Sequence, residues 1–305
     1  MLPPLSTSVP SPSNPVLAAF TRLRVWERGG ERAPHKPLLA LLALGRWSAV
    51  DRTPLRFADI DRPLRALLVE FGPPRRSYHP EFPFWYLRND GVWEVTPADG
   101  YTPRKGHSSP SAKQLRDANA AGQFSPAVRT ALEQSPGLVA DIARVLLEAH
   151  FPPSYHDDIL AAVGLELGVV VTVKTARDRA FRDTVLTAYG CACAVCGVGV
   201  RVGDALVGVE AAHVRWHAQQ GPDTVANGLC LCSLHHKLFD RGAFTLSPDA
   251  KRVWVSDLVN GAKAKRTLVR FHDRELRSKT RPSPEFVAWH HREVFKGRPR
   301  HQTDG

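Results

Sequence analysis

The sequence has no long hydrophobic run and no signal-like start. Its longest apolar stretch, residues 37–45, is far shorter than the roughly 18 residues that a membrane-spanning helix needs, so it predicts a buried helix. Residues 1–15 are rich in proline and serine but lack a basic start and an apolar core, which predicts a disordered tail and excludes a secretory signal. These two absences favour a cytoplasmic protein that has no membrane partner.

Cysteine is scarce as well. The chain has five cysteines, all between residues 191 and 232. An odd number within one short segment does not fit a set of disulfides, and the clustering favours metal binding in a reducing cytoplasm.

Acidic residues are too few to balance the basic ones. The 41 Lys and Arg residues outnumber the 30 Asp and Glu residues, which gives a formal net charge of +11 and a pI near 9.8. Such a charge favours a polyanionic partner, either nucleic acid or an anionic membrane surface. The hydrophobic content of 43% is that of a folded protein, and 305 residues are enough for two domains of ordinary size.

Hydrophobic periodicity predicts a mainly helical N-terminal half. Asn14 is placed to cap a first helix that has Pro15 at its first position. Further helices are expected at residues 37–47, 60–71, 111–121, 125–134, 136–149, 155–166 and 177–188. A β-hairpin is expected where residues 84–87 and 92–95 flank an Asn-Asp-Gly turn, and the β-branched run 167–175 predicts a strand or a stiff linker.

This pattern predicts an α+β protein of two domains. The first, a mainly helical domain with a small β-hairpin, is expected at residues 16–165, and a linker at 166–177 follows it. The second domain is expected at residues 178–297, and residues 298–305 are expected to form a basic tail.

Two short motifs in the second domain have the spacing of zinc ligands. Cys193-Ala-Val-Cys196 is one pair, and Cys232-Ser-Leu-His235 is the other. Together they offer four sulfur and nitrogen donors, which suits a tetrahedral, structural Zn²⁺. Such an ion would tie together the ends of the segment between the pairs and would stabilise a small domain. Two other cysteines remain alternative ligands, Cys191 and Cys230.

Between these pairs and directly after the second one lie residues suited to phosphodiester hydrolysis. That reaction needs an activated water, charge neutralisation at the phosphate and help for the leaving oxygen. His213 lies in an apolar, strand-like run, where a neutral imidazole can be held rigidly as a general base. Asn227, just before a glycine, is placed to pin a hairpin and to orient His213. His236 falls at the start of a helix, where its ring can bind a catalytic divalent metal, Mg²⁺ or Mn²⁺.

These motifs resemble those of an HNH (ββα-metal) endonuclease domain. The resemblance is carried by Cys193-Ala-Val-Cys196, Glu210-Ala-Ala-His213, Asn227-Gly-Leu229 and His235-His-Lys-Leu-Phe-Asp-Arg-Gly242. It implies a zinc-braced nuclease domain in which His213 is the base, Asn227 is structural and His236 binds the metal.

One position departs from this family. Many members carry Asp or His directly before the base as a second metal ligand, whereas this chain has Ala212. Glu210 shares a strand face with Ala212, and Asp240 lies one helical turn after His236, so both remain alternatives for that ligand. Without either of them, the site would work with one ligand fewer.

The first domain contains two clusters that mix basic, aromatic and proline residues. One is at residues 32–36 and the other at 75–85, and a short polar segment follows at 104–109. Basic residues can contact phosphates, aromatic and proline edges can form a small apolar pocket, and a flexible polar loop can read bases. A helical scaffold with ordinary surface charge and a core hairpin would explain the same composition.

Two of these segments, together with residues 89–93, resemble the sulfur-binding domain of phosphorothioate-dependent type IV restriction endonucleases, the McrA-like enzymes. The resemblance is carried by Arg32-Ala-Pro-His-Lys-Pro-Leu-Leu39, His79-Pro-Glu-Phe-Pro-Phe-Trp85 and Asn89-Asp-Gly-Val-Trp93. It implies an apolar pocket for the sulfur that replaces one phosphate oxygen, because sulfur is more polarisable and less strongly hydrated than oxygen. The residues expected at this pocket are Arg32, Lys36, Tyr78, His79, Pro80, Phe82 and Pro83, with His107, Ser108 and Ser109 reading neighbouring bases.

The resemblance therefore predicts a type IV restriction endonuclease that recognises phosphorothioated double-stranded DNA and cuts it nearby at a metal-dependent HNH site. Two alternatives stay open. One is an HNH nuclease directed to methylated or unmodified DNA, and the other is a DNA-binding module with an impaired nuclease. A homodimer is a further expectation, because one HNH site cuts one strand and a double-strand break needs two.

Overall fold

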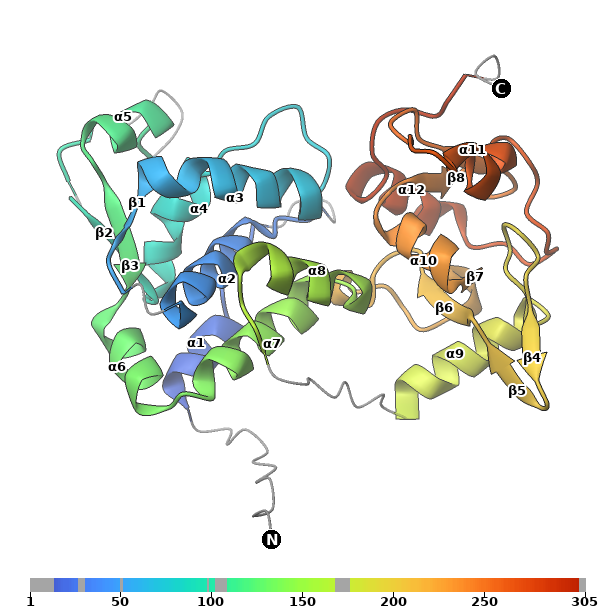
Figure 1. Cartoon of the computed structure of the whole chain (residues 1–305), viewed down its shortest axis with the longest axis horizontal. Coiled ribbons are helices and arrows are strands. Elements are labelled where there is room, and N and C mark those ends of the chain that lie inside the picture. The colour runs from blue at the N-terminus through green and yellow to red at the C-terminus, as the bar shows by residue number, and fades with distance from the viewer. Residues whose placement is uncertain are drawn as a thin grey trace, which may run out of the picture.

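The computed structural model is an α+β fold whose two halves lie side by side (Figure 1). The N-terminal half is a helical body with one small sheet, and the C-terminal half contains short antiparallel strand pairs with helices against them. Within the described part of the chain, no helix is long and apolar enough to cross a membrane. The structure describes residues 14–26, 31–49, 52–97, 99–101, 109–167 and 176–301.

The N-terminal half packs around one apolar helix. Its helices are α1 (Pro15–Thr21), α2 (His35–Ser48), α3 (Phe57–Phe71), α4 (Glu81–Tyr86), η1 (Leu87–Asp90), α5 (Ala112–Asp117), α6 (Pro126–Gln134), α7 (Leu138–His150) and α8 (Pro153–Val163). Residues 37–45 of α2 are all buried, and α3, α4, α7 and α8 pack against this helix. Asn14 caps α1 as predicted, since its side chain accepts hydrogen bonds from the amides of Val16 and Leu17.

The N-terminal half contains a three-stranded sheet where the sequence predicted a two-stranded hairpin. Its strands β1 (Leu55–Arg56), β2 (Trp93–Thr96) and β3 (Ala121–Phe124) pair antiparallel in the order β1-β3-β2. The predicted first strand, residues 84–87, is instead helical. Phe84, Trp85 and Leu87 are all buried, which breaks the alternation of a half-buried strand, and a helix places them together against the core. The helix expected at 111–121 is also shorter, because residue 121 already belongs to β3.

The C-terminal half is a succession of strand pairs and helices. Its strands are β4 (Val200–Val202), β5 (Ala205–Val207), β6 (Val209–His213), β7 (Gly228–Cys232), β8 (Phe244–Leu246) and β9 (Val253–Val255). Its helices are α9 (Ala176–Ala188), η2 (His217–Gln219), η3 (Val225–Asn227), α10 (Ser233–Asp240), α11 (Ala264–Thr267), η4 (Val269–Phe271) and α12 (Pro284–Glu293). β6 pairs with β7 so that Val209 lies opposite Cys232 and His213 opposite Gly228, and α10 follows directly.

Parts of the predicted tails and linker lie outside the described residues, namely 1–13, 168–175 and 302–305. The described residues of the predicted basic tail continue the fold. The amide of Arg298 donates to Asp257, and the amide of Arg300 donates to the carbonyl oxygen of Val255 at 2.9 Å.

The two halves contact each other through buried side chains. The hydrophobic core of the N-terminal half extends to Trp216 and Trp289 of the C-terminal half. The rings of Tyr155 and Trp216 meet edge to face with centroids 5.3 Å apart. Lys296 adds hydrogen bonds from its Nζ to the carbonyl oxygens of Val69 and Gly72 at 3.0 and 2.9 Å. The second half is therefore docked on the first, and α8 is placed next to α10.

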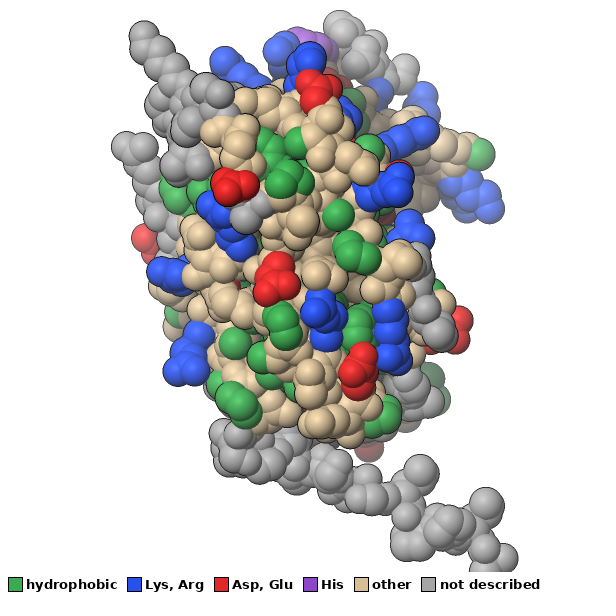
Figure 2. All heavy atoms as spheres, turned by 90° about the vertical axis from the view of Figure 1, so that its left-hand side faces the viewer, with side chains coloured by type: hydrophobic (Ala, Val, Ile, Leu, Met, Phe, Trp, Pro, Cys, Tyr) green, Lys and Arg blue, Asp and Glu red, His purple; other side chains and the backbone are tan. Residues whose placement is uncertain are grey.

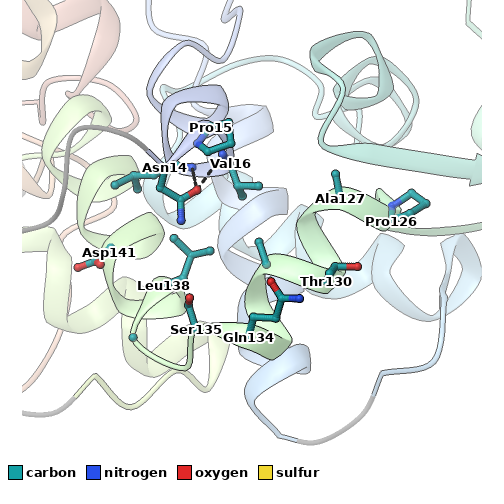
Figure 3. Close-up of a pocket in the computed structure, with 13 residues that line it drawn as sticks. Asn14, Pro15, Val16, Pro126, Ala127, Thr130, Gln134, Ser135, Leu138 and Asp141 are labelled. Carbon is teal, nitrogen blue, oxygen red and sulfur yellow. Dashed lines mark hydrogen bonds between the residues drawn. The ribbon is translucent and has the colours of Figure 1, made fainter.

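A hollow of about 880 Å³ lies at the opposite end of the N-terminal half, between α1, α6 and α7 (Figure 3). It is lined by residues such as Val16, Thr130, Leu138 and Asp141. None of the site residues predicted from the sequence lines it.

Candidate functional site

The segment from β6 to α10 forms a hairpin followed by a helix. His213 closes the first strand, and His236 lies in the first half of the helix. Helix α9 packs closely on this hairpin, which Gly228 permits, because a Cβ there would lie 2.4 Å from a methyl group of Val185. The two histidines are near enough for a charge on His236 to lower the pKa of His213.

His213 has one ring nitrogen held by a carboxylate. Its Nε2 lies 2.8 Å from Oδ1 of Asp223, and the ring of Phe181 stacks on it with centroids 3.9 Å apart. An ionised carboxylate only accepts hydrogen bonds, so Nε2 carries the hydrogen and the lone pair of Nδ1 is left to take a proton. Burial lowers the pKa of His213, and Asp223 offsets part of this effect. The ring is therefore neutral at neutral pH and suited to accept a proton from water.

Asn227 is fully buried and fastens the loop between the two strands. Its Oδ1 accepts a hydrogen bond from the amide of Arg215 at 2.8 Å, and its Nδ2 donates to the carbonyl oxygens of Arg215 and Pro222 at 2.9 and 3.0 Å. This loop carries Asp223. The Asn227 side chain thus holds the carboxylate that orients His213.

His236 lies between two carboxylates that contact opposite nitrogens of its ring. Nδ1 is 2.6 Å from Oε2 of Glu210, and Nε2 is 3.3 Å from Oδ2 of Asp240. Burial disfavours the charged ring, yet Asp240 and Glu210 together raise the pKa of His236. The side chain of Glu210 is 47% exposed and that of Asp240 is 2% exposed. Only Glu210 is therefore open to solvent.

Cys193, Cys196, Cys232 and His235 converge on one point. One ligand atom from each lies within 4.8 Å of the others. The Sγ atoms of Cys196 and Cys232 are 3.9 Å apart, and Nδ1 of His235 lies 3.1 Å from Sγ of Cys232. This group can hold a metal ion.

The orientation of His235 fits a metal ligand. Its Nε2 lies 3.2 Å from the carbonyl oxygen of Thr267, which accepts the ring hydrogen and leaves Nδ1 facing the sulfurs. A hydrogen bond with Cys232 lowers the pKa of the Cys193 thiol, and the same contact raises the pKa of Cys232, so the two sulfurs share one proton in the absence of an ion. Among the described residues, two cysteines that the sequence leaves as alternatives are not part of this group: Cys191 and Cys230.

Five of the residues expected at the reading pocket lie on α4 and on the loop before it. His79 stacks on Phe82 with ring centroids 4.8 Å apart, and its ring nitrogens contact Ser77 and Glu81 at 2.8 and 3.1 Å. The side chain of His79 is 40% exposed. The other three are buried or half-buried in the same segment: Tyr78, Pro80 and Pro83. The stacked pair of His79 and Phe82 is thus partly open to solvent, as is Tyr78, whereas the two prolines are buried.

Arg32 and Lys36 are held by internal partners. The Arg32 side chain is buried, lies over the ring of Trp216 at 4.1 Å and donates to the carbonyl oxygen of Glu293 at 3.1 Å. Burial lowers the pKa of Arg32 to about 10, so the guanidinium stays charged at neutral pH. Nζ of Lys36 lies 2.6 Å from a carboxylate oxygen of Asp90. The structure therefore uses Arg32 in the contact between the two halves.

The residues expected to read bases are described only in part. His107 and Ser108 lie outside the described residues. Ser109 is fully buried, and its hydroxyl has no hydrogen-bond partner among the described residues. Figure 2 shows the outer face of the N-terminal half, where Lys and Arg side chains are spread among Asp and Glu side chains.

Two features of the site were not predicted from the sequence, the contact of His213 with Asp223 and the contacts of α8 with Asp240. Asp223 is the only acidic residue between the predicted base and Asn227, and this was the one signal that could have indicated it. Ser154 and Tyr155 of α8 both donate hydrogen bonds to Asp240 from across the two halves. No sequence pattern indicates a contact between residues so far apart.

Family models match both halves of the chain. A model described as ScoMcrA-like, DNA sulfur-binding domain, matches residues 13–167, and a model described as HNH endonuclease matches residues 193–247. No curated protein matches the chain.

Several solved structures are similar to the chain. The sulfur binding domain of ScoMcrA complexed with phosphorothioated DNA is 20% identical, has a TM-score of 0.43 and is matched over 49% of this chain and 94% of its own. The corresponding SprMcrA complex is 22% identical, with a TM-score of 0.39 over 49% and 91%. The type IV phosphorothioation-dependent restriction endonuclease ScoMcrA is 18% identical, with a TM-score of 0.40 over 66% of this chain and 36% of its own.

The two family matches agree with the two halves of the fold. The HNH match begins at Cys193 and includes β6, β7 and α10. The sulfur-binding match ends shortly after α8 and covers half of the chain. The chain belongs to the family of the ScoMcrA-like DNA sulfur-binding domain, and it joins this domain to an HNH endonuclease domain.

Proposed function

We propose that the chain is a type IV restriction endonuclease that binds phosphorothioated double-stranded DNA with its N-terminal half and hydrolyses phosphodiester bonds nearby with its HNH domain. One observation carries this proposal. The same chain contains a DNA sulfur-binding domain and, in its HNH domain, a hairpin and helix that hold a neutral base, His213. The reaction is placed in the cytoplasm, where the five free cysteines stay reduced.

The residues of the chain supply the base and hold it in place. Asp223 binds Nε2–H of His213, so Nδ1 can take a proton from a water molecule as its oxygen attacks the phosphorus. Asn227 holds the loop that carries Asp223. A divalent ion beside His236, Mg²⁺ or Mn²⁺, would supply charge neutralisation at the phosphate and at the leaving 3′ oxygen.

The geometry favours Glu210 over Asp240 as the second ligand of that ion. An ion bound at Nδ1 of His236 would have the exposed carboxylate of Glu210 as its neighbouring ligand. Nε2 on the other side of the ring then faces Oδ2 of the buried Asp240, which lies 3.3 Å away. A carboxylate that accepts the second ring hydrogen fixes the tautomer and the orientation of a metal-binding histidine. We therefore assign Glu210 and His236 to the metal and Asp240 to the orientation of His236.

A structural Zn²⁺ is proposed at the Cys3His group. Three sulfurs and one imidazole nitrogen within 4.8 Å of one another suit tetrahedral zinc. The hydrogen bond from His235 to Thr267 supports this assignment, because it directs Nδ1 toward the sulfurs. The ion would join the turn at Cys193 to the start of α10, and so would fix the helix that carries His236.

The sulfur contact is proposed at the stacked pair of His79 and Phe82. An aromatic wall discriminates between thiophosphate and phosphate because the weakly hydrated sulfur loses less on leaving water than an oxygen does. Three neighbours would complete the wall: Tyr78, Pro80 and Pro83. The two basic residues of the predicted pocket, Arg32 and Lys36, would support its surroundings through their ion pairs and hydrogen bonds.

The division into two domains is proposed at residues 166–177. The sulfur-binding match ends at residue 167 and the HNH match begins at residue 193, and α8 ends at Val163 while α9 begins at Ala176. A homodimer is proposed as the form that cuts both strands, because each chain carries one HNH site. Sedimentation of the protein on sulfurised DNA tests this, with two chains expected on each modified site.

The function is tested with two plasmids that differ only in phosphorothioation. Incubated with Mn²⁺ or Mg²⁺, the protein is expected to cut the sulfurised plasmid and to leave the plain one intact. Equal cutting of both would overturn the sulfur-directed function, and retention of sulfurised DNA without cutting would show a binding module. The matched control is His213→Ala, which should abolish cutting and still retain sulfurised DNA.

A further inference from the structure

We infer that helix α8 of the sulfur-binding domain forms part of the nuclease site, where Ser154 and Tyr155 position Asp240 and, through it, His236. The inference rests on the metal site proposed at His236. It goes beyond that proposal, because both positioning residues belong to the other domain, and the nuclease domain alone would lack them.

The contacts converge on one carboxylate. The hydroxyl of Ser154 donates a hydrogen bond to Oδ2 of Asp240, the same oxygen that lies 3.3 Å from Nε2 of His236. The hydroxyl of Tyr155 donates to the backbone carbonyl oxygen of Asp240 at 2.6 Å. Since the Asp240 side chain is 2% exposed, these contacts and not bulk water set its position. The oxygen that orients His236 is thus held from the sulfur-binding domain.

The side chain of Tyr155 is itself held rigidly. It is 1% exposed, its ring meets those of Phe71 and Trp216 at centroid distances of 5.7 and 5.3 Å, and the guanidinium of Arg241 lies 4.4 Å from its ring centroid. A buried hydroxyl that lost its acceptor would be costly, so the hydrogen bond to Asp240 ties α8 to the last turn of α10. Small shifts of α8 are therefore transmitted to the helix that carries His236.

A purely structural interface is the competing explanation, and the chain offers a matched control for it. Asp158 lies on the same helix and forms an ion pair with Arg241, next to Asp240 in the sequence. Asp158→Ala removes this interdomain ion pair, which an asparagine would in part replace, and leaves the hydrogen bonds of Ser154 and Tyr155 to Asp240 in place; Asp158→Asn removes its charge alone. If the contacts of α8 serve only to dock the two domains, a change at Asp158 should weaken Mn²⁺ binding as much as changes at Ser154 and Tyr155 do.

The test measures metal binding by the full-length, zinc-loaded protein in the absence of DNA. Mn²⁺ is titrated, and the free ion is followed by electron paramagnetic resonance. Ser154→Ala and Tyr155→Phe are expected to weaken Mn²⁺ binding by about threefold, less than the roughly tenfold loss that follows removal of an outer-shell partner such as Asp240 itself. Ser154→Thr keeps the hydroxyl and should bind as the wild type does, and so should Asp158→Ala and Asp158→Asn.

Two results would overturn the inference. One is wild-type Mn²⁺ binding by both Ser154→Ala and Tyr155→Phe, and the other is an equal loss in Asp158→Ala. Glu210→Gln separates these results from a failure of the proposed metal site. If Glu210→Gln also binds Mn²⁺ as the wild type does, the assignment of Glu210 as a ligand is wrong. If Glu210→Gln loses Mn²⁺ binding while the variants of Ser154 and Tyr155 keep it, the metal site stands and only the positioning role of α8 is refuted.

Discussion

The two histidines of the nuclease site differ in how their ring nitrogens are engaged. His213 has Nε2 on Asp223, which leaves Nδ1 as a base, and burial lowers its pKa. His236 has a carboxylate at each nitrogen, and these carboxylates raise its pKa against the effect of burial. The position between Nδ1 of His236 and Glu210 thus favours a positive charge, which a proton or a divalent ion can supply. One ring is suited to take a proton and the other to hold a cation.

The role of Asp223 gives a prediction for pH dependence. Asp223 raises the pKa of His213 and fixes its tautomer, so Asp223→Asn should lower that pKa further. The acid limb of the cleavage rate, measured at saturating Mn²⁺, should move to lower pH. The maximal rate should fall by roughly 10²-fold, because an asparagine can also stabilise the wrong tautomer and misalign the general base. A rate profile identical to that of the wild type would contradict this role.

The helices and clusters that could be predicted from the sequence are those that a local residue pattern determines. The capped first helix follows from Asn14 and Pro15, and the spacing of the cysteine pairs predicts the metal cluster that the structure assembles. The segment 84–87 could not be predicted in the same way. Its aromatic residues favour a strand locally, but three of its four side chains are buried, and only packing against α2 and α3 decides for a helix.

The metal cluster gives a prediction at the scale of the hairpin and its helix. Cys193→Ser removes one of four ligands, so the protein should lose zinc and the melting temperature of its C-terminal half should fall by roughly 10 °C or more. Cys191→Ser is the control, because Cys191 lies two residues away and outside the cluster. Calorimetry and zinc analysis of the two variants test this together. Full zinc content in Cys193→Ser, or zinc loss in Cys191→Ser, would refute the ligand set.

At the scale of the whole molecule, the contact between the halves was the least predictable feature. Arg32 looks from the sequence like a DNA ligand, because it is basic and precedes a buried helix. In the structure its guanidinium is buried, donates to the backbone carbonyl oxygen of Glu293 and lies over Trp216, and both residues are far away in the chain. A sequence pattern reports local burial and periodicity, whereas the use of a charge in an interface depends on which distant surface covers it.

Histidines with lowered pKa values in both halves predict that the molecule loses stability in mild acid. Burial lowers the pKa of His35 and His150 to about 4 and that of His290 to about 3, whereas an unfolded histidine titrates near 6.5. Below about pH 6.5 the unfolded chain binds protons that the folded chain does not, so the free energy of unfolding should fall as the pH falls toward 4. Each residue contributes about 1.4 kcal/mol per pH unit within this window. Urea unfolding of the wild type and of His150→Gln at pH 7, 6 and 5 measures this, and the variant should lose stability less steeply by one residue's share. Parallel curves for the two proteins would show that His150 does not remain neutral in the folded state.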